Sequence, residues 1–134
     1  MEKKETISIG ELARRAGCKT VTVRYYERLG LVADPKRTPG GHRCYEDTHL
    51  QRLTFIIRCR QLGFPLTQVR ELLNLSDSGQ TACNDVRGIA QRHLREVREK
   101  IAELEQLEAR LTTLTGQCDA GTTQRCPIIE SLSH

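Results

Sequence analysis

Two cysteines near the end of the chain, Cys118 and Cys126, have the chemistry of metal ligands. They lie eight positions apart in the polar segment GQCDAGTTQRCPI, whose flexible Ala120-Gly121 step can let the loop wrap an ion. Soft metal ions commonly take three sulfur ligands, and zinc normally takes four donors. The pair therefore predicts a metal site that needs at least one further ligand from elsewhere in the chain.

The third ligand is expected from the other end of a long helix. Cys83 lies at the start of this helix and Cys118 just past its end, 35 residues later, so they are separated by about 50 Å within one chain. Ligands of one ion lie within about 4 Å of one another. If two copies pair antiparallel, Cys83 of one subunit approaches the partner subunit's Cys118 and Cys126. The spacing thus predicts a three-cysteine site at each end of a homodimer.

Sulfur-only coordination favours mercury, lead or cadmium, whereas zinc would need oxygen or nitrogen donors as well. Asp119, next to Cys118, and His93 are the candidate donors, although His93 lies about 15 Å along the helix from Cys83. The other cysteines are expected to pack or to lie in turns: Cys18, Cys44 and Cys59. A reversible disulfide between Cys118 and Cys126 is the alternative, which would make the protein a thiol-redox regulator.

The elements that must position these ligands are predicted to be mainly helical. Ser8 and Glu11 form a capping box, which predicts a helix over residues 9–16, and Thr20 is expected to cap a second helix that ends at Leu29. Two short helices joined by a tight turn indicate a helix-turn-helix. Its inward-facing residues are expected to be Leu12, Ala13, Val21 and Leu29.

Residues 31–45 are rich in proline, glycine and basic side chains, and the Gly40-Gly41 pair is a turn signal. This segment is expected to form a short hairpin, or wing. Apolar stripes predict a third helix over residues 47–63 and a fourth helix after the break at Pro65. These elements together predict a winged helix-turn-helix DNA-binding domain over residues 1–75.

Residues 82–115 contain no proline and predict one long dimerisation helix. Its apolar seam has the spacing of a two-stranded coiled coil: Ala90, Leu94, Val97, Ile101, Leu104 and Leu111. Glu108 interrupts this seam, and Leu107 and Leu114 can cover the gap. A lone helix of this kind exposes its stripe, so we expect it to bury against its own copy. Residues 116–134 would follow as a metal-binding loop and a short C-terminal helix.

Charge is unevenly distributed along the chain. Residues 1–75 carry 14 Lys and Arg against 8 Asp and Glu, a net charge of +6, whereas residues 76–134 carry 7 against 9, a net charge of −2. A basic N-terminal half suits a polyanion such as DNA. No apolar run reaches membrane-spanning length and the N-terminus lacks a signal-peptide core, so a cytoplasmic protein with no membrane partner is expected. Nucleophile–base pairings, phosphate loops and the H-E-x-x-H motif are absent from the sequence, so an enzyme is not expected.

Several motifs in this order resemble the MerR family of transcription regulators over nearly the whole chain: SIGELARRAG, TVTVRYYERLGL, GGHRCYE, an apolar helix ending in QLGF, and the long dimer helix. The VRYYE-x-x-GL block joined to G-x-R-x-Y is the specific part of the match. The resemblance implies a winged helix-turn-helix domain, an antiparallel coiled-coil homodimer and binding to double-stranded promoter DNA. It further implies that metal binding distorts this DNA, so that RNA polymerase engages the promoter.

The same resemblance assigns roles to individual residues. It implies DNA contacts from the second helix and the wing: Arg24, Tyr25, Tyr26, Arg37, His42, Arg43 and Tyr45. Tyr25 is the better phosphate contact of the two adjacent tyrosines, because Tyr26 can point into the core. Cys83, Cys118 and Cys126 match the branch of the family that senses divalent soft metals, which implies an activator of a heavy-metal resistance or efflux operon. A zinc-responsive regulator of the same family is the alternative.

Overall fold

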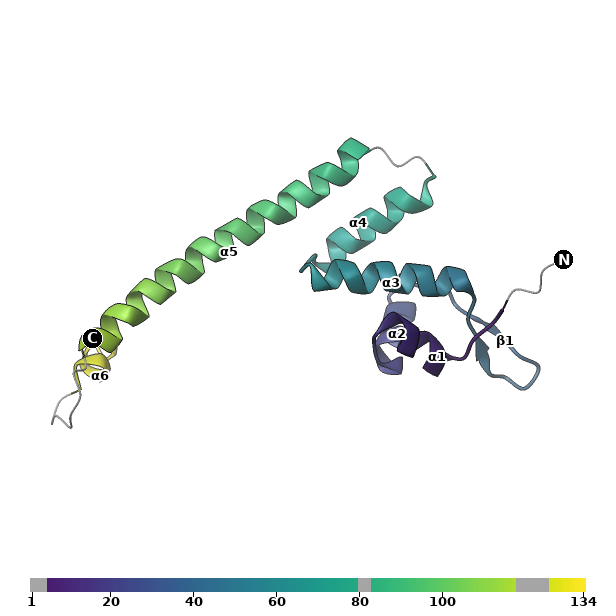
Figure 1. Cartoon of the computed structure of the whole chain (residues 1–134), viewed down its shortest axis with the longest axis horizontal. Coiled ribbons are helices and arrows are strands. Elements are labelled where there is room, and N and C mark those ends of the chain that lie inside the picture. Colours follow the sequence, from purple (N-terminus) through teal and green to yellow (C-terminus); the bar gives the residue numbers. More distant parts are fainter. Residues whose placement is uncertain (1–4, 80–82, 118–125) are drawn as a thin grey trace. The chain divides into compact units, whose positions relative to one another are not determined.

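The computed structural model describes residues 5–79, 83–117 and 126–134 (Figure 1). Its elements in chain order are α1 (Ile9–Ala16), α2 (Thr20–Arg28), β1 (Lys36–Arg37), β2 (Arg43–Cys44), α3 (Asp47–Gln61), α4 (Leu66–Asp77), α5 (Cys83–Gln117) and α6 (Pro127–Leu132). The described part of the chain is mainly helical, and β1 and β2 form its small antiparallel sheet. The predicted fold class is therefore confirmed. Contacts within the chain gather into two units, residues 1–89 and 90–134.

Helix α1 begins and ends where its capping residues predict. The Ser8 hydroxyl accepts a hydrogen bond from the Glu11 backbone N–H at 3.2 Å. At the other end Gly17 has φ +79°, a left-handed conformation that favours glycine, and its N–H donates to the Ala13 carbonyl. The next helix begins differently from the prediction, because Thr20 is its first helical residue and Lys19 is the N-cap, with no side-chain hydrogen bond.

The core of the N-terminal unit is built from α1 to α4 and the wing. Its fully buried large side chains are Leu12, Val23, Leu31, Val32, Tyr45, Leu53, Ile56 and Val69. On α2 the buried residues are Val23 and Tyr26, three positions apart on one helix face. Val21 lies two residues before Val23, about 200° round the helix, and is 67% exposed. The prediction that Val21 faces inward is therefore wrong.

The wing is a short hairpin attached to the start of the chain. Strands β1 and β2 pair antiparallel, with Arg37 opposite Arg43. Between them Gly41 has φ +84°, so the turn uses the glycine that the sequence places there. Ile7 and Tyr45 exchange backbone hydrogen bonds of 2.8 and 2.9 Å, which hold the base of the wing against the segment that precedes α1.

Two arginines connect the end of α2 to the two following helices. Arg52 on α3 donates to the Leu31 carbonyl and forms two hydrogen bonds with the Asp77 carboxylate, at 2.7 and 3.1 Å. Arg70 on α4 donates to the Leu29 carbonyl at 2.8 Å. The Leu29 carbonyl is at the C-cap of α2, and the Leu31 carbonyl lies just beyond the helix, so these bonds satisfy carbonyls at and immediately after its C-terminal end. They fix the position of α2 within the unit.

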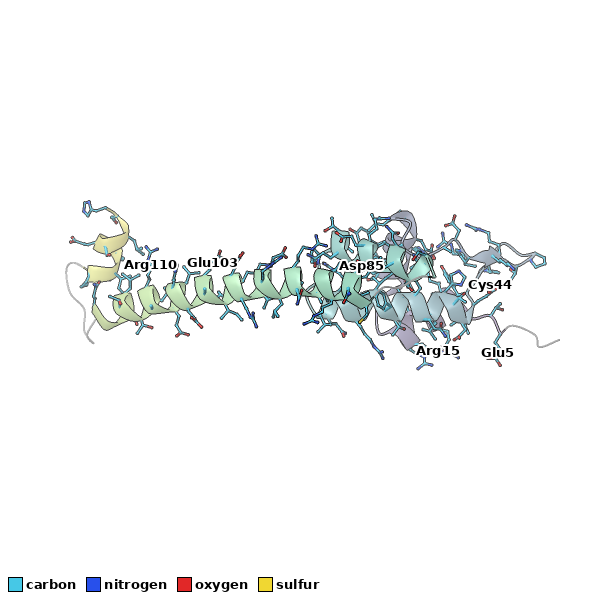
Figure 2. All side chains as sticks on the ribbon, turned by 90° about the horizontal axis from the view of Figure 1, so that it is seen from above. Glu5, Arg15, Cys44, Asp85, Glu103 and Arg110 are labelled. Atoms are coloured by element: carbon cyan, nitrogen blue, oxygen red, sulfur yellow. The ribbon has the colours of Figure 1, made fainter. Side chains whose placement is uncertain are left out.

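Helix α5 has two kinds of apolar residue. Its first turns belong to the N-terminal unit, since Ile89 is only 6% exposed within that core and Val86 packs against it. Further along, the predicted seam residues Leu94, Ile101 and Leu111 are 44% to 59% exposed in the single chain. Figure 2 shows other side chains, Glu103 and Arg110 among them, projecting outward from the same helix. None of the helices in the described residues is long and apolar enough to cross a membrane.

Candidate nucleic-acid interface and metal ligands

Basic side chains from α2 and the wing surround one hollow of about 430 Å³ in the N-terminal unit. Its lining residues are Ser8, Ile9, Arg24, Arg37, Gly41, His42 and Arg43. The structure thus brings together four of the residues expected to contact DNA, although they come from separate elements. Three guanidinium groups at one open hollow favour a polyanionic ligand, because none of the residues that line the hollow is acidic.

Three of the residues that line the hollow were not predicted as DNA contacts from the sequence, and one of them, Gly41, was expected only to form the turn of the wing. Ser8 and Ile9 lie at the N-terminus of α1, where the capping box was recognised only as a helix signal. The other arginines of α1 are less available, since Arg14 and Arg15 both form ion pairs with Glu11, at 2.6 and 2.8 Å. Hydrogen bonds from these two arginines lower the pKa of the Glu11 carboxyl to about 2. Glu11 thus offsets part of the positive charge of α1, whereas none of the residues that line the hollow is acidic.

The two adjacent tyrosines of α2 have different environments. Tyr25 is 42% exposed beside Arg24 on the outer face of the helix, whereas Tyr26 is 7% exposed and belongs to the core. Their ring centroids lie 5.5 Å apart with the planes tilted by 52°, so the buried ring supports the exposed one. The greater exposed fraction of Tyr25 agrees with the preference for Tyr25 as the phosphate contact. The Tyr26 ring has little accessible surface with which to contact DNA.

Tyr45 lies entirely inside the protein. Its side chain is 0% exposed, its ring meets His49 edge-on at 5.4 Å, and its hydroxyl donates a hydrogen bond to the Glu27 carboxylate. Burial, and then the Glu27 carboxylate, raise the pKa of Tyr45 above its ordinary value. A wholly buried side chain has no surface for a phosphate group. Contrary to the expectation, Tyr45 therefore supports the wing from inside and does not belong with the exposed basic residues.

The described cysteines fall into two groups. Burial raises the pKa of the Cys18 and Cys59 thiols, which fits packing roles, and the Cys44 thiol lies 3.9 Å from the His42 carbonyl in the wing. Cys83 is exposed as the first residue of α5, and Cys126 is half-buried at the N-cap of α6.

The predicted three-cysteine site extends beyond the described residues, because Cys118 and its neighbour Asp119 lie outside them. Within the described ranges, no three His, Cys, Asp or Glu side chains gather to hold a metal ion. The helix that begins at Cys83 runs for 35 residues without a break, which corresponds to about 50 Å. The two predicted ligands that the structure does describe, Cys83 and Cys126, are thiols, which soft cations prefer as donors.

Comparisons with known proteins agree with this geometry. Residues 7–76 match the MerR HTH family of regulatory proteins, and residues 50–114 match the MerR DNA-binding family. The chain belongs to the MerR family. The first match covers the helix-turn-helix and the wing, which form the basic hollow, and extends through α3 and most of α4.

Three relatives place the chain in the heavy-metal-sensing branch of the MerR family. The HTH-type transcriptional regulator ZntR of Escherichia coli K12 is 42% identical over 129 residues, which cover 94% of this chain and 92% of ZntR. The crystal structure of the transcription regulator PbrR691 from Ralstonia metallidurans CH34, in complex with lead(II), has a TM-score of 0.83 and 44% identity and covers 94% of this chain and 98% of PbrR691. The structure of the dual-function regulator MerR from Bacillus megaterium MB1, in complex with mercury(II), has a TM-score of 0.75 and 33% identity. This match covers 96% of this chain and 100% of the Bacillus megaterium chain. These MerR-family relatives are transcription regulators rather than enzymes.

Proposed function

We propose that this MerR-family protein is a cytoplasmic, homodimeric regulator that binds promoter DNA and activates a heavy-metal resistance or efflux operon. A soft divalent cation would bind Cys83 of one subunit together with the partner subunit's Cys118 and Cys126. The bound cation supplies the binding energy that favours a distorted promoter, which RNA polymerase then engages.

The observation that carries the DNA-binding half of the proposal is the basic hollow. Arg24 from α2 and Arg37, His42 and Arg43 from the wing line it together. A recognition helix with an adjacent basic hairpin can contact bases in the groove and phosphates beside it. Tyr25, exposed next to Arg24, adds a hydroxyl that can donate to a phosphate oxygen.

The exposed seam of α5 supports the dimer. Leu94, Ile101, Leu104 and Leu111 repeat at coiled-coil spacing and remain exposed in the single chain. Burying such a stripe against an antiparallel copy removes apolar surface from water. The same arrangement brings the start of one α5 beside the end of the other, which is where the remaining cysteines occur in the sequence.

The relatives support a soft cation as the effector. Similarity to one regulator crystallised with lead(II) and to another crystallised with mercury(II) favours these two ions, and three thiolates suit both of them. Cadmium shares this ligand preference. Zinc requires a further donor, for which Asp119 and His93 are the sequence candidates.

Mixed dimers test the shared site. One subunit carries Cys83→Ser and the other carries both Cys118→Ser and Cys126→Ser, so that only one end of the dimer retains three cysteines. We expect lead(II) or mercury(II) titration to find one three-sulfur site per mixed dimer, through its ultraviolet thiolate–metal band. Two intact sites, or none, would contradict ligands shared between subunits.

A matched pair of arginine variants tests the DNA surface. Arg24→Ala should remove one phosphate or base contact from each subunit and weaken promoter binding by about tenfold or more. When the contact is a phosphate, the slope of log K against log salt concentration should fall by about 1.8 per dimer, which is about 0.9 for each subunit. Arg95→Ala removes the same charge from an exposed position of α5 and should leave the salt dependence unchanged. Equal effects of the two variants would mean that the hollow is not the DNA-binding surface.

A promoter-reporter assay with mercury, lead, cadmium and zinc salts, performed under anaerobic reduction, separates the effectors. A response to a metal under these conditions excludes the redox mechanism that uses a disulfide between Cys118 and Cys126. A response restricted to zinc would favour the zinc-responsive alternative over the three-sulfur site.

A further inference from the structure

The outward face of α2 carries one large apolar residue among basic and aromatic ones. Val21, Arg24, Tyr25 and Arg28 are all exposed, and their spacing of three, one and three residues places them in one strip along the helix. Val21 begins this strip, in the first turn of the helix, with 67% of its surface exposed. Arg24, one turn later, is a residue of the basic hollow.

Contacts within the described residues of the N-terminal unit leave most of the Val21 side chain exposed. The helix begins with four β-branched residues, TVTV, and such residues lower helix stability relative to alanine. Val23 is completely buried in return, whereas Val21 remains 67% exposed. The Val21 side chain is therefore exposed at a cost to the helix, at the end of the helix that enters the groove in a helix-turn-helix protein.

The chemistry of valine restricts what it can recognise there. Its side chain has no hydrogen-bond donor or acceptor, so it cannot read the polar edge of a base pair. Thymine alone presents an apolar group in the major groove, the C5-methyl. A β-branched side chain is also held in few rotamers, so little conformational freedom is lost when it meets that methyl group.

We propose that Val21 is a specificity-determining residue, which reads a thymine in each half of the promoter site through contact with the thymine C5-methyl group. This inference rests on the proposed DNA-binding function. Arg24 holds the helix against the DNA, and Val21 selects the base pair opposite the first turn of α2.

Deoxyuridine, which differs from thymidine only by the missing methyl, provides the test. A duplex is selected from randomised DNA by the full-length wild-type dimer, and each thymine is then replaced by deoxyuridine at symmetric positions in both half-sites. At one thymine position, wild-type affinity should fall about fourfold per half-site, as expected for one buried methyl group. The Val21→Ala variant should bind the selected duplex more weakly than wild type and lose nothing further from the same replacement.

The controls separate this inference from the proposed function. Val21→Ala introduces a better helix former at an exposed site, so circular dichroism should show unchanged helicity. Leu62→Ala shortens another exposed apolar residue, 69% exposed after α3, and should keep the full sensitivity to deoxyuridine. Equal losses for wild type and Val21→Ala at every thymine would overturn the inference and leave the proposed function intact. If the wild-type dimer selected no sequence at all, both proposals would fall.

Discussion

Replacing Ile89 by alanine tests whether the start of α5 is part of the core of the N-terminal unit. Ile89 lies in the long helix that was predicted for dimerisation. Its side chain is nevertheless only 6% exposed, because it packs into the core of the N-terminal unit, residues 1–89. The substitution removes three buried carbon atoms and leaves a cavity. Because the cavity forms in the core of that unit, the damage should appear in α1 to α4 rather than in the dimer contact.

The magnitude follows from the burial. Replacing a buried isoleucine by alanine costs about 2–5 kcal/mol. In a unit of this size each kcal/mol lowers the melting temperature by about 4–8 °C. We therefore expect the N-terminal unit of the Ile89→Ala variant to melt at least about 8 °C below that of wild type, at any protein concentration.

The matched control is the same substitution about three turns further along the helix, Ile101→Ala. Ile101 is 49% exposed in the single chain, so its loss should spare the N-terminal unit and weaken dimerisation, which makes its melting temperature depend on concentration. Hydrogen exchange of the full-length chain, read on the amides of α3, distinguishes the two. Unchanged α3 protection in Ile89→Ala would refute the assignment of Ile89 to this core.

Three further results are expected. Tyr45→Phe removes the hydroxyl bonded to Glu27 and should cost about 1–3 kcal/mol in urea denaturation, since the acceptor is charged; no loss would mean that water replaces the bond fully. Arg52 lowers the pKa of Asp77 below its ordinary 3.8, so Asp77→Asn should be slightly less stable than wild type at pH 7. This stability difference should disappear as the pH falls below 3.8 and through the folded-state pKa of Asp77. A stability difference that persisted in acid would argue against the ion pair. Gly41→Ala forces a left-handed alanine and should destabilise the wing by about 1–2 kcal/mol, seen as faster amide exchange there and unchanged exchange in α3.

Local signals in the sequence were sufficient for the helix boundaries of α1 and for the wing turn. Ser8 and Gly17 act on their own helix through hydrogen bonds of short range, so their effect does not depend on the rest of the fold. Gly41 likewise adopts the positive φ that its turn requires. Thr20 shows the limit of such signals, because a residue suited to capping became the first helical residue instead.

Residues whose roles depend on long-range packing were harder to predict. Tyr45 matches a family motif in the sequence, but its burial depends on Glu27 and His49, which reach it from α2 and α3. Val21 and Val23 are equally apolar, and only the packing of α2 decides which one is buried. The convergence of Arg24 with Arg43 likewise arises from the way the wing folds back towards α2.

The burial of Ile89 determines where this protein can be recombined with its relatives. A hybrid whose crossover lies between Ser78 and Cys83 would exchange Val86 and Ile89 and thereby alter the interior of the half that reads the promoter. A crossover after Ile89 keeps that interior whole, but Cys83 then stays with the DNA-reading half while Cys118 and Cys126 come from the donor. On the proposed shared metal site, the residues that set the effector preference would then be divided between the two parts of the hybrid, and exchanging the C-terminal part alone would give a mixed ligand set.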